Sequence, residues 1–135
     1  MAVGANNQIL TLLNRRVTVY NPATGQVARE INLPPASPLE SPYQSTLGRA
    51  NGEILVSDVL TLSVLRFAAN GAQLAPLGVA GQMPGQFASP GALAEDPQGR
   101  VYVSDGLHHV VQRFSADGQV DAIYSTAEDE QEPPR

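Results

Sequence analysis

The sequence lacks cysteine and tryptophan entirely, and only 5% of its 135 residues are aromatic. Without cysteine the chain can form no disulfide bond, thiolate nucleophile or cysteine-ligated metal site. Because aromatic side chains are few, the core must be built from valine, leucine, isoleucine and alanine, which fit β-strands covered on both faces. At this length the chain suits one domain.

A long apolar run is also missing near the start of the chain. The first sixteen residues show no basic start followed by an extended apolar stretch, and the longest such run, Ile9 to Leu13, includes Thr11. The sequence therefore predicts neither a signal peptide nor a transmembrane segment, and a cytoplasmic location is the default expectation.

Basic residues are scarce as well. The formal net charge is −5, and all eight basic residues are arginine. Much of the negative charge lies in the last eight residues, so the body of the chain is nearly neutral. A basic stripe that could neutralise phosphates is absent, apart from a local patch at Arg15 and Arg16, which argues against a nucleic-acid partner.

What the chain does contain is a tandem repeat. Residues 52–71, GEILVSDVLTLSVLRFAANG, and residues 99–118, GRVYVSDGLHHVVQRFSADG, align without a gap, share ten of twenty positions and lie 47 residues apart. A more degenerate copy occupies residues 7–25. A period of about 40 to 50 residues, with short strands divided by glycine turns, is typical of β-propeller blades.

Each repeat predicts four strands. Candidate innermost strands, residues 43–48 and 91–96, precede the second and third copies, and a further apolar strand follows each glycine turn. The predicted fold class is all-β, a partial β-propeller of about three four-stranded blades, which is half of a six-bladed propeller. The expected units are a degenerate and incomplete blade at 1–33, blades at 34–78 and 79–126, and an acidic disordered tail at 127–135.

The expected connections between blades are rich in turn-forming residues. Residues 33–42 contain four prolines, and residues 78–91 contain four glycines around a single large apolar side chain, Phe87. We expect Phe87 to pack beneath its loop. Gly71 and Gly118 should supply the positive φ angles of tight turns.

The third repeat carries a more specific motif. Residues 85–118, GQFASPGALAEDPQGRVYVSDGLHHVVQRFSADG, follow the pattern G-x-F-x-x-P-x-G-I-A-x-D, then G-x-I-Y-V-A-D, then N-x-R-I-Q-x-F. In this the chain resembles the NHL repeat, a family of propeller blades. The family's asparagine is replaced by His108 and Thr61, and its arginine by Val110 and Ser63. Matching positions are Gly85, Phe87, Pro90, Ala94, Asp96, Gly99, Tyr102, Val103, Asp105, Gln112, Phe114 and Gly118.

Three blades do not close a ring, because propellers use four to eight. An open stack leaves apolar blade faces and strand edges exposed. Two hypotheses follow with equal weight. Two copies of the chain could form a closed six-bladed homodimer, or the sequence could be a non-autonomous fragment of a longer propeller.

Asp58 and Asp105 are the best candidates for a polar constellation, since equivalent positions of successive blades lie on one rim. The favoured interpretation is structural: each carboxylate accepts hydrogen bonds from the backbone N–H groups of the next residues. Ser57 and Ser104 precede them, but no nucleophile elbow surrounds either serine.

Four other ionisable residues are candidates for a chemical role. His108 and His109 are adjacent in a predicted hairpin and would point to opposite faces within a strand, so a shared metal is not expected. Glu95 and Asp96 follow an innermost strand, and we expect a solvated loop pair rather than a catalytic dyad.

The sequence thus predicts a scaffold without catalysis of its own, which binds a protein, a peptide or a small ligand through rim loops. We expect no catalytic residue, no metal ligand and no cofactor. The alternative is an enzyme, because six-bladed propellers that resemble this one include metal-dependent lactonases and an NHL-like lyase with the site in the central channel. The candidate channel groups, Ser45, Thr46, Leu93 and Ala94, are neutral. The candidate binding residues are Asp58, Leu60, Thr61, Asp105, His108 and His109.

Overall fold

The computed structural model describes residues 2–3, 8–13, 15–33 and 43–125. These residues form strands and turns without any helix, so none of them belongs to a helix able to cross a membrane. The proline-rich segment 34–42 and the predicted tail 127–135 lie outside the described residues.

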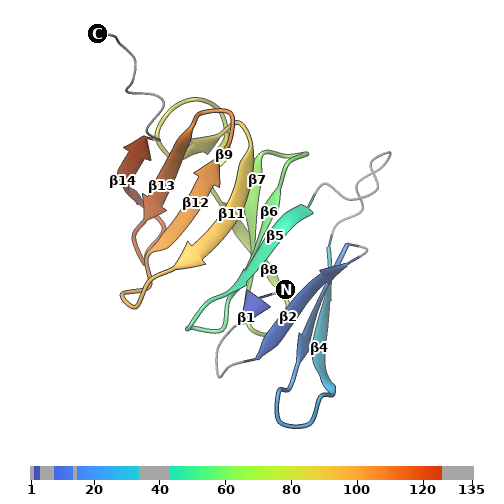
Figure 1. Cartoon of the computed structure of the whole chain (residues 1–135). Helices are drawn as coiled ribbons and strands as arrows, with labels where there is room; N and C mark the ends of the chain where they lie inside the picture. Colours follow the sequence, from blue (N-terminus) through green and yellow to red (C-terminus); the bar gives the residue numbers. More distant parts are fainter. Residues whose placement is uncertain (1, 4–7, 14, 34–42, 126–135) are drawn as a thin grey trace, which may run out of the picture.

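The strands form three antiparallel sheets in which each strand pairs with the next along the chain (Figure 1). Two short strands, β9 (Val79–Ala80) and β10 (Gln86–Phe87), pair in parallel between the second and third sheets. The first sheet contains β1 (Ala2–Val3), β2 (Ile9–Leu13), β3 (Arg16–Tyr20) and β4 (Val27–Asn32). The second contains β5 (Tyr43–Gly48), β6 (Ile54–Asp58), β7 (Ser63–Phe67) and β8 (Gln73–Leu77). The third contains β11 (Pro90–Glu95), β12 (Val101–Asp105), β13 (Val110–Phe114) and β14 (Val120–Ser125).

The sheets are arranged as blades around a common side. The first strand of the middle sheet, β5, contacts β1 and β2 of the first sheet and β11 of the third. The last strands, β4, β8 and β14, are the outer strands of their sheets (Figure 1). This arrangement confirms the predicted all-β, partial propeller fold.

Alternation along each strand sends its side chains to two different interfaces. In β6, Ile54 and Val56 are buried against the first blade, while Leu55 is buried against the third. Val101 and Val103 of β12 both face the second blade, as their spacing predicted. The core is therefore two layers between blades rather than one central cluster.

Phe87 anchors the connection between the second and third blades, as predicted. Its side chain is fully buried, and its ring centroid lies 5.9 Å from that of Phe114. Gly78 has a φ of +80°, and a Cβ there would lie 2.3 Å from the Phe87 ring. Only glycine fits this position, because a side chain would displace the anchor.

The backbone repeats as closely as the sequence does. Arg15, Leu62 and His109, spaced by 47 residues, have φ angles of 59°, 57° and 58° at the same point of three successive hairpins. The predicted positive φ angles of Gly71 and Gly118 are confirmed, at 93° and 94°. The residue directly before the second strand of the hairpin is therefore left-handed in all three copies, although two residues separate the paired strand ends in the first copy and four in the others.

Two serines shape the innermost strands. The Ser57 hydroxyl oxygen accepts the N–H of Ser45 at 3.0 Å, and Ser104 accepts the N–H of Ala92 at 2.8 Å. Both bonds lie where the pairing register shifts near the start of the innermost strand. Each serine therefore satisfies a backbone donor that the irregular ladder leaves without its regular partner.

Candidate binding rim

The hairpins that follow β2, β6 and β12 project from the same edge of the three blades, toward the upper side of Figure 1. We call this edge the hairpin rim. It carries all six predicted binding residues, because each of them lies at the end of β6 or β12 or in the turn that follows.

Asp58 closes the turn of the second blade. One carboxylate oxygen accepts the N–H groups of Leu60 at 2.8 Å and Thr61 at 3.3 Å, and the other accepts the Thr61 hydroxyl at 2.7 Å. The residue is buried. The predicted turn-capping role is confirmed, and Thr61 is part of the same cap.

Asp105 caps the turn of the third blade in the same way. It also holds the segment that connects the second blade to the third. One oxygen accepts the N–H groups of Leu107 and His108, at 3.2 and 3.1 Å. Its carboxylate also accepts the N–H groups of Ala88 at 2.8 Å and Ser89 at 3.1 Å, just before β11. This carboxylate therefore fixes the hairpin relative to the neighbouring loop.

Exposed leucines stand on these hairpins. Leu60 and Leu107 occupy the same turn position of the second and third hairpins, 47 residues apart, and are 47% and 68% exposed. Leu13, the last residue of β2, is 69% exposed beside the first hairpin. An exposed leucine is unremarkable by itself, but its recurrence in two equivalent turns, with a third leucine beside the first hairpin, gives one rim a repeated apolar character.

The two histidines have different environments. His109 is exposed and adopts the left-handed conformation of the turn. His108 places Nδ1 3.2 Å from the Asp105 carboxylate, and its Nε2 is buried without a hydrogen-bond partner among the described residues. The structure does not bring the two rings into one site.

His108 lines a pocket of about 210 Å³ at the rim. The remaining walls are largely apolar, and two of them, Met83 and Ile123, are exposed large side chains. The sequence did not predict this pocket, since it joins the glycine-rich connection to the outer strands. Its lining residues are Gln82, Met83, Pro84, His108, Val110, Gln112 and Ile123.

The opposite edge carries an ionic cluster that the sequence reasoning missed. The Arg49 side chain is 9% exposed, and its guanidinium donates to Glu53 at 3.1 Å, to Glu95 at 2.9 Å and to the Gly99 carbonyl oxygen at 2.8 Å. Glu53 also accepts a bond from Arg66 at 3.0 Å. Arg49 thus joins the second blade to the third.

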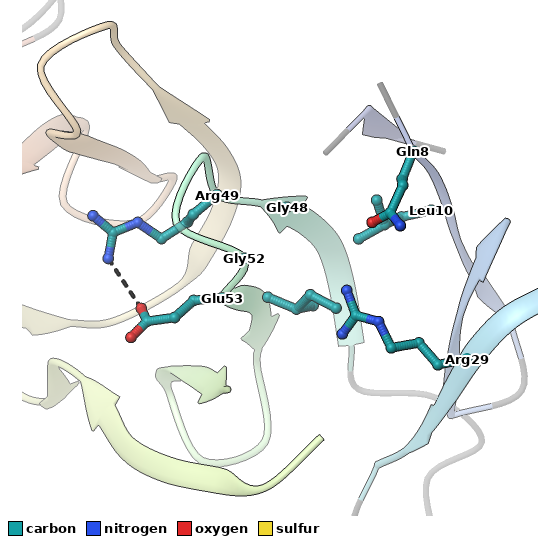
Figure 2. Close-up of a pocket in the computed structure, with 8 residues that line it drawn as sticks. Gln8, Leu10, Arg29, Gly48, Arg49, Gly52 and Glu53 are labelled. Atoms are coloured by element: carbon teal, nitrogen blue, oxygen red, sulfur yellow. Dashed lines mark hydrogen bonds and ion pairs between the residues drawn. The ribbon is translucent and has the colours of Figure 1, made fainter. Parts of the chain in front are cut away.

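Figure 2 shows the Arg49–Glu53 ion pair of the second blade on one side of a small pocket and Gln8, Leu10 and Arg29 of the first blade on the other. The enclosed space is about 10 Å³, which is enough for about one water molecule. A signal for the cluster exists in the sequence: at 47-residue spacing, Arg49 and Glu53 align with Asp96 and Arg100, so the second and third repeats each have an opposite-charge pair, with the signs exchanged.

The expectation that Glu95 and Asp96 form a solvated pair is wrong. Their side chains are 11% and 15% exposed because each is engaged by an arginine, Glu95 by Arg49 and Asp96 by Arg100. Burial raises the pKa of Asp96. Hydrogen bonds from the Arg100 backbone and guanidinium and from the Tyr102 hydroxyl outweigh this effect and lower that pKa to about 2.

The expected channel residues are occupied by structural bonds. The Ser45 hydroxyl donates to the Gly91 carbonyl oxygen at 2.6 Å, and the Thr46 hydroxyl donates to the Leu55 carbonyl oxygen at 3.0 Å. Within the part of the chain that the structure describes, no three histidine, aspartate or glutamate side chains are grouped so that they could hold a metal.

Fold and site together define a partial β-propeller with stiff hairpins on one rim. Comparisons with known proteins agree on the fold: this chain is similar to virginiamycin B lyase from Staphylococcus aureus, with a TM-score of 0.66 at 14% identity over 93% of the chain. It is also similar to AztD from Citrobacter koseri, with a TM-score of 0.63 at 13% identity over 92% of the chain. A protein of unknown function from Bacteroides caccae has a TM-score of 0.57 at 15% identity over 93% of the chain.

The chain spans 40% of the length of the lyase, 34% of AztD and 44% of the Bacteroides protein. No family model matches the sequence, and none of the curated proteins matches it. At these identities the likeness establishes the propeller fold.

Proposed function

We propose that this chain is an NHL-like propeller module that binds a protein or peptide partner at its hairpin rim and catalyses no reaction itself. The observation that carries the proposal is the recurrence of an exposed leucine, Leu60 and Leu107, at the same position of two turns that are each held by a buried aspartate cap. Binding residues on stiff scaffolds are concentrated in such loops.

The NHL-like assignment is supported by what the matching residues do. Phe87 is the buried anchor before the innermost strand, Asp105 caps the hairpin, and Gly99 and Gly118 have the positive φ angles that their turns require. The two positions at which the second and third repeats depart from the family lie in or directly after the turn, so they alter the rim rather than the blade.

The His108 pocket gives the partner a defined chemistry. An apolar side chain would contact Met83, Pro84 and Ile123, while a polar group beside it could bond the exposed side-chain amide of Gln82. Apolar pockets with one or two fixed polar groups are common anchor sites for peptide side chains. A peptide with spaced apolar residues and a neighbouring hydrogen-bonding group fits this description.

The test uses a displayed library of random peptides selected on the purified full chain. Peptides that bind should lose at least tenfold in affinity for the double variant Leu60→Ser, Leu107→Ser, because their apolar contacts are removed. The matched control, Ala69→Ser with Ala116→Ser, changes exposed turn residues at the opposite edge and should leave affinity unchanged. Binders that are indifferent to the leucines, or no binders at all, would overturn the proposal.

A further inference from the structure

The middle blade shows how this sequence covers a blade on both faces. All five residues of β6 are buried. Leu55, Ser57 and Val64 are fully buried on the side of the third blade, and Ile54 and Val56 pack on the side of the first. A complete blade–blade contact in this chain therefore leaves no exposed side chain at the centre of the sheet.

The third blade lacks such cover on the face turned away from the second. Tyr102, Ser104 and Val111 are only partly buried, although they lie 47 residues after Leu55, Ser57 and Val64. Tyr124 is 47% exposed at the position where Leu77 is 7% exposed. We call Ala94, Tyr102, Ser104, Val111 and Tyr124 the C-terminal end face.

This end face has the character of an uncovered interior surface. The Tyr102 and Tyr124 rings are stacked with centroids 6.4 Å apart. A shallow, mainly apolar hollow of about 200 Å³ includes Ala94, Tyr102 and Val111. The equivalent hollow of the second blade is filled by side chains of the third, including Val101, Val103 and Phe114.

The first blade is uncovered on the opposite side. In the middle blade the equivalent positions Ile54, Val56 and Phe67 are each at most 2% exposed. In the first blade the corresponding residues are only partly buried, and Val27 on the adjacent strand is 51% exposed. We call this set the N-terminal end face; its members are Ile9, Thr11, Thr18, Tyr20 and Val27.

One chain therefore presents both halves of a blade–blade contact, and these halves lie at opposite ends of the arc of blades (Figure 1). These three blades by themselves do not bring the two faces together, because they span too little of a ring that needs at least four. The named residues of both sets are uncharged. Charged side chains flank them, Arg113 in register with Tyr102 on one face and Glu30 in register with Thr18 on the other, and these two charges have opposite sign.

We propose that the occupant of each end face is the opposite end face of a second copy of this chain. Two head-to-tail contacts would close six blades around a twofold axis and leave no blade face open. The contact between the second and third blades is the model for this interface. There Val64 lies in one cluster with Val101 and Val103. By the same geometry, Val111 of one copy would lie against Ile9 and Thr11 of the other. The closed ring would carry six hairpins on one rim.

Light scattering coupled to size-exclusion chromatography tests this on the purified full chain. We expect a mass twice the 14.2 kDa of one chain. Val111→Arg should halve the observed mass, because it places an unpaired charge at the centre of the contact. Ala75→Arg adds the same group at an exposed position on the outer strand of the middle blade and should leave the dimer intact.

The head-to-tail arrangement has its own signature. Thr11→Arg, on the other end face, should also give a monomer. An equimolar mixture of the two monomeric variants should recover the mass of two chains through one contact, because Val111→Arg keeps its N-terminal end face and Thr11→Arg keeps its C-terminal end face. The second contact of this pair carries both arginines and stays open. The recovery also shows that both variants are folded. A monomeric wild-type protein at tens of micromolar would overturn the proposal, as would a dimer that either substitution leaves unchanged.

Discussion

At the scale of single residues, the aspartates at the same position of two repeats accept different sets of hydrogen bonds. Among the described residues, Asp58 accepts hydrogen bonds from Leu60 and Thr61 of its own turn, whereas Asp105 holds its turn and also the N–H groups of Ala88 and Ser89 from the preceding connection. The difference arises because the connection before the third blade folds back over the hairpin. Hydrogen bonding to buried carboxylates is thus not equal across the repeats.

Replacing each aspartate by alanine should expose this difference. Asp105→Ala leaves four backbone donors without their carboxylate, and we expect a loss of about 3 kcal/mol in the free energy of unfolding. Asp58→Ala removes the cap from two backbone donors and should cost about half as much. Urea denaturation of the two variants measures both values. Equal losses would contradict the proposed double role of Asp105.

Asp96 predicts a dependence of stability on pH. Its pKa is about 2 in the folded protein, against an ordinary value of 3.8, so the folded state binds the proton more weakly than the unfolded chain. Its contribution is therefore fully present above about pH 4 and is lost as the pH falls toward 2.

Asp96→Asn removes this titration. Thermal melts between pH 2 and 5 should show the wild type ahead of the variant at pH 5 and the gap closing as the pH falls to 2. The lowered pKa of Glu53 also makes wild-type stability fall with acid, but that change is shared by the variant. A gap that stays constant over this range would contradict the assignment to Asp96.

At the scale of elements, the second blade is tied to the third by two kinds of contact. Apolar side chains of alternate strand positions fill the interface, and polar bonds close it at both edges. Ser45 bonds the Gly91 carbonyl oxygen near one edge, while Arg49 reaches Glu95 and Gly99 at the other. The blades are therefore held in a fixed relation rather than merely stacked.

A double-mutant cycle tests the Arg49 joint. Arg49→Ala should cost about 3 kcal/mol of unfolding free energy, because it leaves two partly buried carboxylates without their shared partner. Glu95→Ala should be costly in the wild type and much milder in the Arg49→Ala background, since its main partner is then gone. Denaturant unfolding of the four proteins gives the coupling energy. If the losses of unfolding free energy in the two single variants add up to the loss in the double variant, the Arg49–Glu95 interaction has no coupling energy and the prediction is wrong.

Much of the element structure could be predicted from the sequence. The alternation in ILVS and VYVS, the glycines after Asn70 and Asp117, and the aspartate at each strand end indicated strands, turns and caps that the structure confirms. The ionic cluster was missed because its partners are 46 residues apart and belong to different repeats. Patterns within a short sequence window cannot predict pairs of residues that are so far apart in the chain.

At the scale of the whole molecule, the hairpin rim and the two end faces are separate surfaces. The rim is formed by turns, and the end faces are formed by the flat sides of the outermost blades. The peptide and oligomer experiments can therefore fail independently. If the Val111→Arg variant is monomeric and still binds the selected peptides, the result would support the hairpin rim as the peptide site and the end faces as the separate oligomer contact.

The sequence by itself determined the strands, the turn chemistry, the repeat length and thus the propeller architecture, because period-two alternation and glycine turns act within a few neighbouring residues. Only the tertiary structure decided which faces stay open, which arginine joins two blades, and where the His108 pocket forms. Those features depend on the distance and twist between blades, which arise from packing over the whole chain rather than from any local pattern.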